Sequence, residues 1–162
     1  EVVEARKDTT VIIHPLTDHR RTLSIDKLGQ VIQADDGFLL VVSYNPGYQN
    51  AVKDLKHSTR QRFVAIEFDF PDVDRETKII SHESGIEEGI SNQLAVLGQK
   101  IRNLREHGLE EGASTRLLIY AARLIKQGIS PKRACQVALT WGITDEVQIQ
   151  ETVDQIVSSI FE

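Results

Sequence analysis

The chain has 162 residues, a net charge of −5 and an apolar fraction of 40%, which is enough to bury a core. Because no basic surplus exists to displace counterions, we expect no nucleic-acid partner. The single cysteine, Cys135, excludes a disulfide framework and a cysteine metal site, and it suits the cytoplasm. No apolar stretch approaches membrane-spanning length and no signal peptide is visible, so we expect no membrane partner.

The first part of the chain predicts a helix followed by a hairpin. Residues 1–20 are helical in composition, and Pro15 should end or kink that helix. The segments 21–25 and 30–34 alternate between polar and apolar residues, which predicts two strands of a β-hairpin. Gly29 would supply the positive φ of its turn.

Two apolar runs predict strands after the hairpin. Residues 38–43 carry an apolar run without a polar break from Phe38 to Val42, which predicts a buried strand of a parallel α/β sheet. Pro46 stops this strand and leaves Asn45 at the carboxyl edge, where a carboxamide can hold a water or a phosphate oxygen. A turn asparagine is the alternative, and this segment alone does not separate the two. A second strand is expected at 63–70.

The rest of the sequence predicts helices. Periodicity and capping residues place them at 73–84, 87–106, 114–127, 131–140 and 144–160. Ser130 should cap the fourth of these helices ahead of Pro131, and Gly128 should close the third. Strands first and helices last indicate an α/β unit over residues 1–72 joined to an α-helical domain over residues 73–162.

Two arginines lie where an anion could bind. Ser114 and Thr115 precede an apolar helical run, so Arg116 falls in the first turn, where its charge opposes the helix dipole. We therefore interpret Arg116 as an anion ligand rather than a partner in a surface salt bridge. Arg62 lies between a polar helix and an apolar strand, and its rigid fork suits phosphate; Arg60 could share or support this role. An exposed arginine in a charged loop is the alternative for Arg62.

Taken as a set, six segments closely resemble the CbbQ/NorQ branch of the MoxR-type AAA+ ATPases, and they lie at 1–10, 13–21, 43–49, 53–56, 58–63 and 112–118. The resemblance runs from the Walker B motif to the C-terminus. It implies an α/β fold, the second half of an AAA+ P-loop core with an inserted β-hairpin (residues 21–34), followed by a helical lid. The match is nearer to the CbbQ type, which acts as a rubisco activase, than to the sister type, which matures nitric oxide reductase.

The resemblance implies roles for particular residues. Glu1 falls on the Walker B glutamate, which polarises the attacking water, and Asn45 falls on sensor 1, which positions that water against the γ-phosphate. Arg62 matches the arginine finger offered to the neighbouring subunit's nucleotide, with Arg60 as a possible secondary finger. Arg116 matches sensor 2, which reaches from the lid to the same phosphate. Each of these groups suits phosphoryl transfer.

Part of the expected active site is absent from the sequence. The chain has no Walker A loop, Gly-x-x-x-x-Gly-Lys-[Ser/Thr], and no aspartate before Glu1 to help hold Mg²⁺. We therefore expect a segment of a larger ATPase that uses ATP and Mg²⁺. Alone, this chain should be inactive and should contain no metal site; we interpret His14 and His19 as structural.

The resemblance also implies partners. They are further copies of the chain in a hexameric ring, a von Willebrand factor A domain adaptor, and rubisco as the remodelled target. The alternatives are a nitric oxide reductase maturation ATPase or, if the missing P-loop is genuine, a non-catalytic interaction domain.

Overall fold

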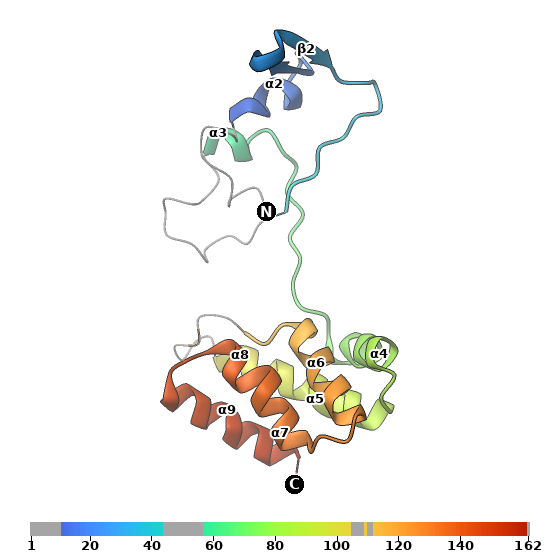
Figure 1. Cartoon of the computed structure of the whole chain (residues 1–162), viewed down its shortest axis with the longest axis vertical. Coiled ribbons are helices and arrows are strands. Elements are labelled where there is room, and N and C mark those ends of the chain that lie inside the picture. Colours follow the sequence, from blue (N-terminus) through green and yellow to red (C-terminus); the bar gives the residue numbers. More distant parts are fainter. Residues whose placement is uncertain (1–10, 44–56, 105–108, 110–111, 162) are drawn as a thin grey trace. The chain divides into compact units, whose positions relative to one another are not determined.

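The structure is a computed structural model of the chain, and it describes residues 11–43, 57–104, 109 and 112–161. The chain divides into two compact units, residues 1–67 and residues 68–162, and each is described by itself (Figure 1). The expected domain division after residue 72 stays a prediction. Among the helices of the described residues, none combines the length and the apolar character that crossing a bilayer requires.

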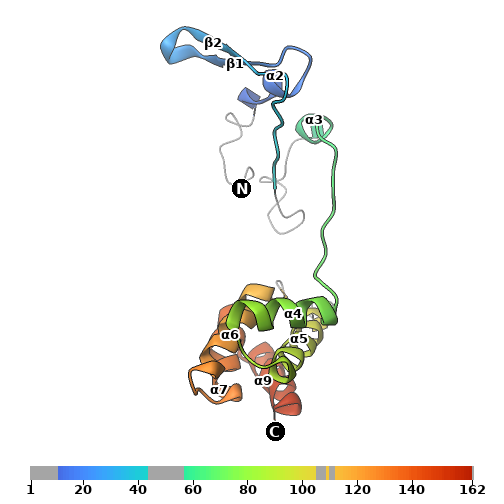
Figure 2. The ribbon, with the colours of Figure 1, turned by 90° about the vertical axis from the view of Figure 1, so that its right-hand side faces the viewer.

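The first unit contains the predicted β-hairpin. Strand β1 (Thr22–Ile25) pairs antiparallel with strand β2 (Gln30–Gln33), and the two lie side by side in Figure 2. A 3-10 turn over Asp26–Leu28 joins them, and Gly29 closes this turn at φ 60°. The hairpin and the need for glycine at its turn are therefore confirmed.

The base of the hairpin is held by an arginine with an unusual backbone conformation. Arg21 has φ 49°, in the left-handed region that residues other than glycine rarely adopt. Its Nη2 donates to the backbone oxygens of Asp35 at 2.8 Å and Phe38 at 3.2 Å. These bonds tie the chain that enters the hairpin to the chain that leaves it.

Two short helices complete the described part of the first unit. Pro15 lies in the first turn of helix α2 (His14–Thr17), and a turn precedes this helix, so the expected interruption is present. Helix α3 spans His57–Arg60. His14 Nε2 lies 2.9 Å from Thr59 Oγ1, and this hydrogen bond joins α2 to α3. The contact agrees with a structural role for His14.

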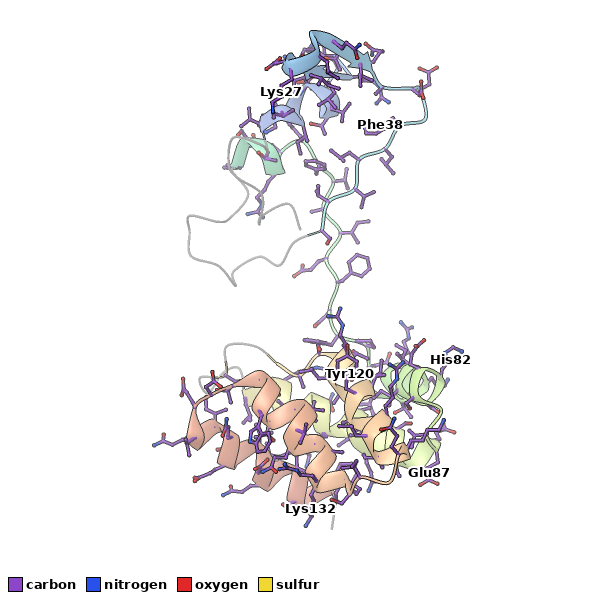
Figure 3. All side chains as sticks on the ribbon, viewed as in Figure 1. Lys27, Phe38, His82, Glu87, Tyr120 and Lys132 are labelled. Carbon is purple, nitrogen blue, oxygen red and sulfur yellow. The ribbon has the colours of Figure 1, made fainter. Side chains whose placement is uncertain are left out.

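The prediction of strands at residues 38–43 and 63–70 is wrong. Both segments are extended but form no ladder, and Leu39 and Val64 are 80% and 94% exposed. Figure 3 shows Phe38 and the side chains after it projecting from an extended chain. A strand needs hydrogen bonds to a neighbour and cover on its faces. Within the described residues, the one sheet is the β1–β2 hairpin, which pairs with neither segment.

The second unit is helical, as the sequence predicts. Its helices are α4 (Val73–Ser84), α5 (Glu88–Arg102), α6 (Thr115–Lys126), α7 (Pro131–Cys135), α8 (Trp141–Ile143) and α9 (Val147–Ile160). Helix α5 ends at Arg102, and residues 105 and 106 of the helix expected at 87–106 lie outside the described residues. The helix expected at 131–140 consists of α7 and a π-helical segment, Gln136–Thr140, that continues into α8.

Of the two caps that the sequence predicts, at Gly128 and Ser130, one is present, and Asp72 provides a further cap that was not predicted. Gly128 adopts φ 93° after α6 and closes it, as predicted. The Asp72 side chain accepts a hydrogen bond from the backbone nitrogen of Arg75 at 2.8 Å and caps α4. Ser130 is the exception, because its hydroxyl makes no capping bond; the helix start is set by Pro131 in the first turn.

The hydrophobic core of the second unit lies between its helices. Helices α5 and α6 both pack against α4, and α9 lies against α5 (Figures 1 and 2). Helix α5 contributes Leu94, Leu97 and Ile101, which meet Leu118 of α6 and Val153 of α9, and all five are fully buried. This core joins α6 to α5 and α9.

Cys135 is fully buried in α7, and burial, together with the nearby Asp154 carboxylate, raises the pKa of its thiol to about 12. We therefore expect iodoacetamide at pH 8 to leave Cys135 unmodified in the folded chain and to alkylate it rapidly in denaturant. Peptide mass spectrometry measures the labelled fraction, and fast labelling without denaturant would contradict the burial.

The same shift predicts a pH dependence of stability. The unfolded thiol loses its proton above its usual pKa near 9, whereas the folded thiol keeps its proton up to about pH 12. The unfolded state then binds fewer protons, so the free energy of unfolding should fall as pH rises through this window. A Cys135→Ala chain should lack this part of the decrease.

Candidate functional site

The structure describes three of the five predicted site residues. Glu1 and Asn45 lie outside the described residues. Arg60 and Arg62 belong to the first unit, and Arg116 belongs to the second. Arg60 and Arg62 therefore lie together at one turn of the first unit, and Arg116 lies in the second unit.

Arg60 and Arg62 lie at the end of a fixed helical turn. Thr59 is 1% exposed and is bonded to His14, so α3 is tied to the body of the first unit. The backbone nitrogen of Arg62 donates to the Thr59 oxygen at 3.1 Å, which continues the turn beyond Arg60. Both arginine side chains are exposed, and neither has an ion-pair or hydrogen-bond partner in the part of the chain that the structure describes.

Arg116 is the second residue of α6 and therefore lies in the first turn, as the sequence predicts. Ser114 caps this helix by accepting a hydrogen bond from the backbone nitrogen of Leu117, and no acidic residue lies in the first turn. The Arg116 side chain is exposed and has no ion-pair partner among the described residues. Its charge therefore opposes the helix dipole with no acidic residue in its own turn, and it is available to an external anion.

A buried ion pair that was not predicted from the sequence contacts this turn. Arg102 donates to both carboxylate oxygens of Glu76, at 2.8 and 2.6 Å, and Thr115 Oγ1 donates to Glu76 Oε1 at 2.6 Å. Glu76 is only 1% exposed. A sequence signal existed: Glu76 lies three residues after Val73 and four before Ile80, on the apolar face of α4.

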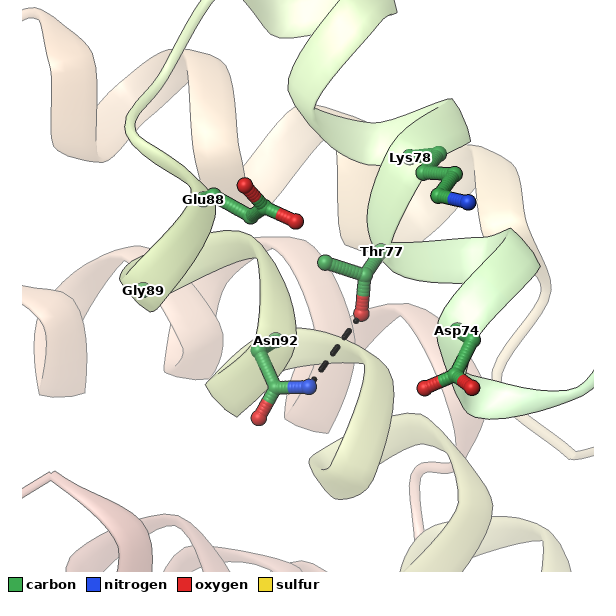
Figure 4. A pocket seen from close by; sticks show the side chains of 6 residues that line it. All are labelled: Asp74, Thr77, Lys78, Glu88, Gly89 and Asn92. Atoms are coloured by element: carbon green, nitrogen blue, oxygen red, sulfur yellow. Dashed lines mark hydrogen bonds between the residues drawn. The ribbon is translucent and has the colours of Figure 1, made fainter.

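A hollow between α4 and α5 is separate from the three arginines and from the buried ion pair. Figure 4 shows its lining, which consists of Asp74, Thr77, Lys78, Glu88, Gly89 and Asn92. Asn92 Nδ2 donates to Thr77 Oγ1 at 3.4 Å, and that hydroxyl donates to the Val73 oxygen at 2.7 Å. The buried hydroxyl is thus already partnered, and none of the three described arginines predicted to bind phosphate is among the residues that line the hollow.

The described residues offer arginines rather than metal ligands. Among them, no three His, Cys, Asp or Glu side chains are grouped so that they could hold a metal ion. An exposed guanidinium without an internal partner presents a planar fork that matches phosphate oxygens. Aimed at a transferring phosphoryl group, such a fork stabilises the charge that develops there.

Comparison with known proteins matches both halves of the chain. A profile described as CbbQ/NirQ/NorQ C-terminal matches residues 76–160, and one described as an AAA domain of the dynein-related subfamily matches residues 1–63.

Three relatives show the extent of the similarity. Protein CbbQ of Hydrogenophilus thermoluteolus is 51% identical over 99% of this chain and 60% of its own length. The denitrification regulatory protein NirQ of Pseudomonas aeruginosa is 57% identical over 90% of this chain and 56% of its own length. Protein NorQ of Paracoccus denitrificans is 52% identical over 99% of this chain and 60% of its own length. The chain thus spans less than two thirds of the length of these relatives.

Proposed function

Because this chain belongs to the CbbQ/NirQ/NorQ family and its first 63 residues match an AAA domain, we propose that it supplies the Walker B, sensor and lid part of an ATP-hydrolysing remodelling protein. The observation that carries the proposal is Arg116, exposed in the first turn of α6 with no ion-pair partner among the described residues. ATP and Mg²⁺ are the proposed cofactors of the complete protein.

The proposed mechanism assigns one task to each residue. Glu1 polarises the attacking water and Asn45 holds it in line with the γ-phosphate. Arg116 contacts the phosphate bound to its own subunit, and Arg62 contacts the phosphate bound to the neighbouring subunit. Both guanidinium groups stabilise charge that is greater in the transition state than in the ground state, so they raise kcat more than they lower KM. A finger that acts on a neighbour requires further copies of the chain, and we propose a hexameric ring in the cytoplasm.

The proposed target is a metabolic enzyme that the ring remodels through a von Willebrand factor A domain adaptor. Rubisco is the first candidate, supported by 51% identity to the relative named CbbQ. Nitric oxide reductase is the second, supported by 57% identity to the relative named as a denitrification regulatory protein. ATPase assays with each purified target and its adaptor separate the two, since the true target should change the ATPase rate and gain activity.

Substitution of Arg116 tests the proposal. In the complete protein, Arg116→Ala should lower kcat for ATP hydrolysis on the order of 30- to 1,000-fold, which corresponds to about 2–4 kcal/mol of lost transition-state stabilisation. Steady-state assays at saturating ATP measure this change. Unchanged turnover would remove Arg116 from the site.

A matched control lies in the same domain. Arg75 is also an exposed arginine in the first turn of a helix, and among the described residues it forms one ion pair, an exposed 3.4 Å contact with Asp72. Arg75→Ala should leave kcat within about twofold of the unmodified protein, because exposed pairs contribute little. An equal loss in both variants would point to a general effect of surface charge.

A further inference from the structure

The buried carboxylate of Glu76 holds the first turn of α6 in place. Thr115, the residue before Arg116, donates its hydroxyl proton to Glu76 Oε1 at 2.6 Å. Arg102 binds the same carboxylate through Nη1 and Nη2, so each oxygen has a guanidinium donor. The side chains of Arg102 and Glu76 are 10% and 1% exposed, so water screens this interaction weakly.

Arg102 also fixes the residues on the other side of the helix cap. Its Nε donates to the Ala113 backbone oxygen at 2.8 Å, and its guanidinium carbon lies 3.9 Å from the centroid of the Phe70 ring. A Cβ at Gly112 would lie 2.9 Å from Arg102 Cγ, so the backbone approaches Arg102 closely here. Arg102 and Glu76 thus bind residues on both sides of the cap Ser114.

Stability alone is a weak explanation for this network. Removing two charges from water costs several kcal/mol per ion, and a well-packed apolar pair is often as stable as a buried ion pair. Bidentate geometry, by contrast, fixes orientation, because the planar fork and the carboxylate meet in one arrangement. The network fixes Ala113 and Thr115 directly, and Arg116 follows Thr115 in the same helical turn.

The network also determines which cation binds the Glu76 carboxylate. Thr115 brings the Glu76 carboxylate to the turn that carries Arg116, and an unpaired carboxylate there would attract Arg116 inward. Arg102 occupies both oxygens and neutralises the charge. The Arg116 side chain remains exposed without an ion-pair partner in the described part of the chain.

We propose that Glu76, Arg102 and Thr115 are positioning residues that hold Arg116 toward the nucleotide phosphate. This inference rests on the proposed function, in which Arg116 contacts that phosphate. The three side chains touch no reacting atom; they fix the rotation of the first turn of α6 and keep its cation free. A change in the network should therefore act through Arg116 and in the transition state.

Thr115 offers the sharpest test, because valine keeps its shape and removes only the donor. In the complete protein, Thr115→Val should lower kcat for ATP hydrolysis by about 10-fold while changing KM by less than about threefold, since a small misplacement of a catalytic group costs mainly the transition state. Thr115→Ser keeps the hydroxyl and should restore kcat to within about twofold. In an Arg116→Ala background, Thr115→Val should cause no further loss.

Thr140 provides the matched control. Its Oγ1 donates to Asp154 Oδ1 at 2.6 Å, and Thr140 is fully buried in the same domain. Thr140→Val removes an equally short hydroxyl–carboxylate bond that involves no residue of α6. It should lower the thermal midpoint at least as much as Thr115→Val and leave kcat unchanged.

The outcomes separate this inference from the proposed function. If Arg116→Ala leaves kcat unchanged, the proposed function fails. If Arg116→Ala lowers kcat but Thr115→Val does not, the proposed function stands and the positioning role is overturned. A full additional loss from Thr115→Val in the Arg116→Ala background would also overturn it. Should Thr115→Val not fold, Arg102→Lys keeps the charge but loses the fork, and the same kcat loss and the same dependence on Arg116 are expected of it.

Discussion

Rings mixed from Arg62→Ala and Glu1→Gln subunits of the complete protein should hydrolyse ATP, although each homogeneous mutant ring should be nearly inactive. In the proposed ring, an Arg62→Ala subunit would lack only the finger that it lends, and its own phosphate site would stay whole. A Glu1→Gln subunit has the opposite defect. An interface where the first subunit binds the nucleotide and the second donates the finger is therefore complete.

The expected effect is large because the proposed finger would act on the transferring phosphoryl group. The rate of ATP hydrolysis at each defective interface should fall on the order of 10³-fold or more, by analogy with other arginine fingers. The local structure suits this role: Arg62 is exposed and follows a turn whose Thr59 is buried and bonded to His14. A side chain at the end of a fixed turn loses less entropy when it engages a neighbour.

ATPase activity measured against the mixing ratio gives the result directly. The profile should rise from near zero at either end to a maximum at intermediate ratios. The same titration with Arg60→Ala in place of Arg62→Ala decides which arginine is the finger, because only the true finger needs rescue by the partner. A flat, inactive profile with confirmed subunit exchange would count against a role in trans and return Arg62 to an exposed arginine of a charged loop.

Local sequence signals were sufficient to predict most of the helices in the second unit. The helices after residue 72 combine apolar periodicity with local stops, such as Gly128 at φ 93° and Pro131 in a first turn. Such signals act within a few residues and need no distant partner. The position of Arg116 in a first turn followed from the same local reasoning.

The two predicted strands that do not form show what local sequence signals cannot predict. Residues 38–43 and 63–70 have a strand-like composition, but a strand exists only where a neighbour supplies hydrogen bonds and cover. Val41 and Phe68 are 77% and 89% exposed. The sequence of a segment does not reveal whether its neighbour is present.

The Glu76–Arg102 pair was missed for a related reason. Its two members are 26 residues apart and on different helices. A charged residue on an apolar face signals that a partner exists, but only packing reveals which one. Thr115, the third member, looked like an ordinary residue at a helix start, and its hydroxyl gained a role only through the fold.

Removing one member of this pair should strongly destabilise the second unit. Arg102→Met leaves the Glu76 charge buried without its main partner, and we expect it to lower the free energy of unfolding by about 3–5 kcal/mol. Urea unfolding of the 162-residue chain measures this loss, with fluorescence from Trp141, the one tryptophan, as the probe of this unit. The slope of the transition should stay unchanged, because the surface exposed on unfolding is the same.

Two further variants separate the buried charge from lost packing. Arg75→Met removes the same type of side chain from an exposed pair, in which Arg75 is 80% exposed, and it should cost less than about 1 kcal/mol. The double variant Glu76→Leu with Arg102→Met removes both charges, and it should recover much of the loss because no unpaired ion remains buried. Equal stability losses in the double variant and in Arg102→Met would instead assign the cost to the missing contacts with Phe70 and Ala113.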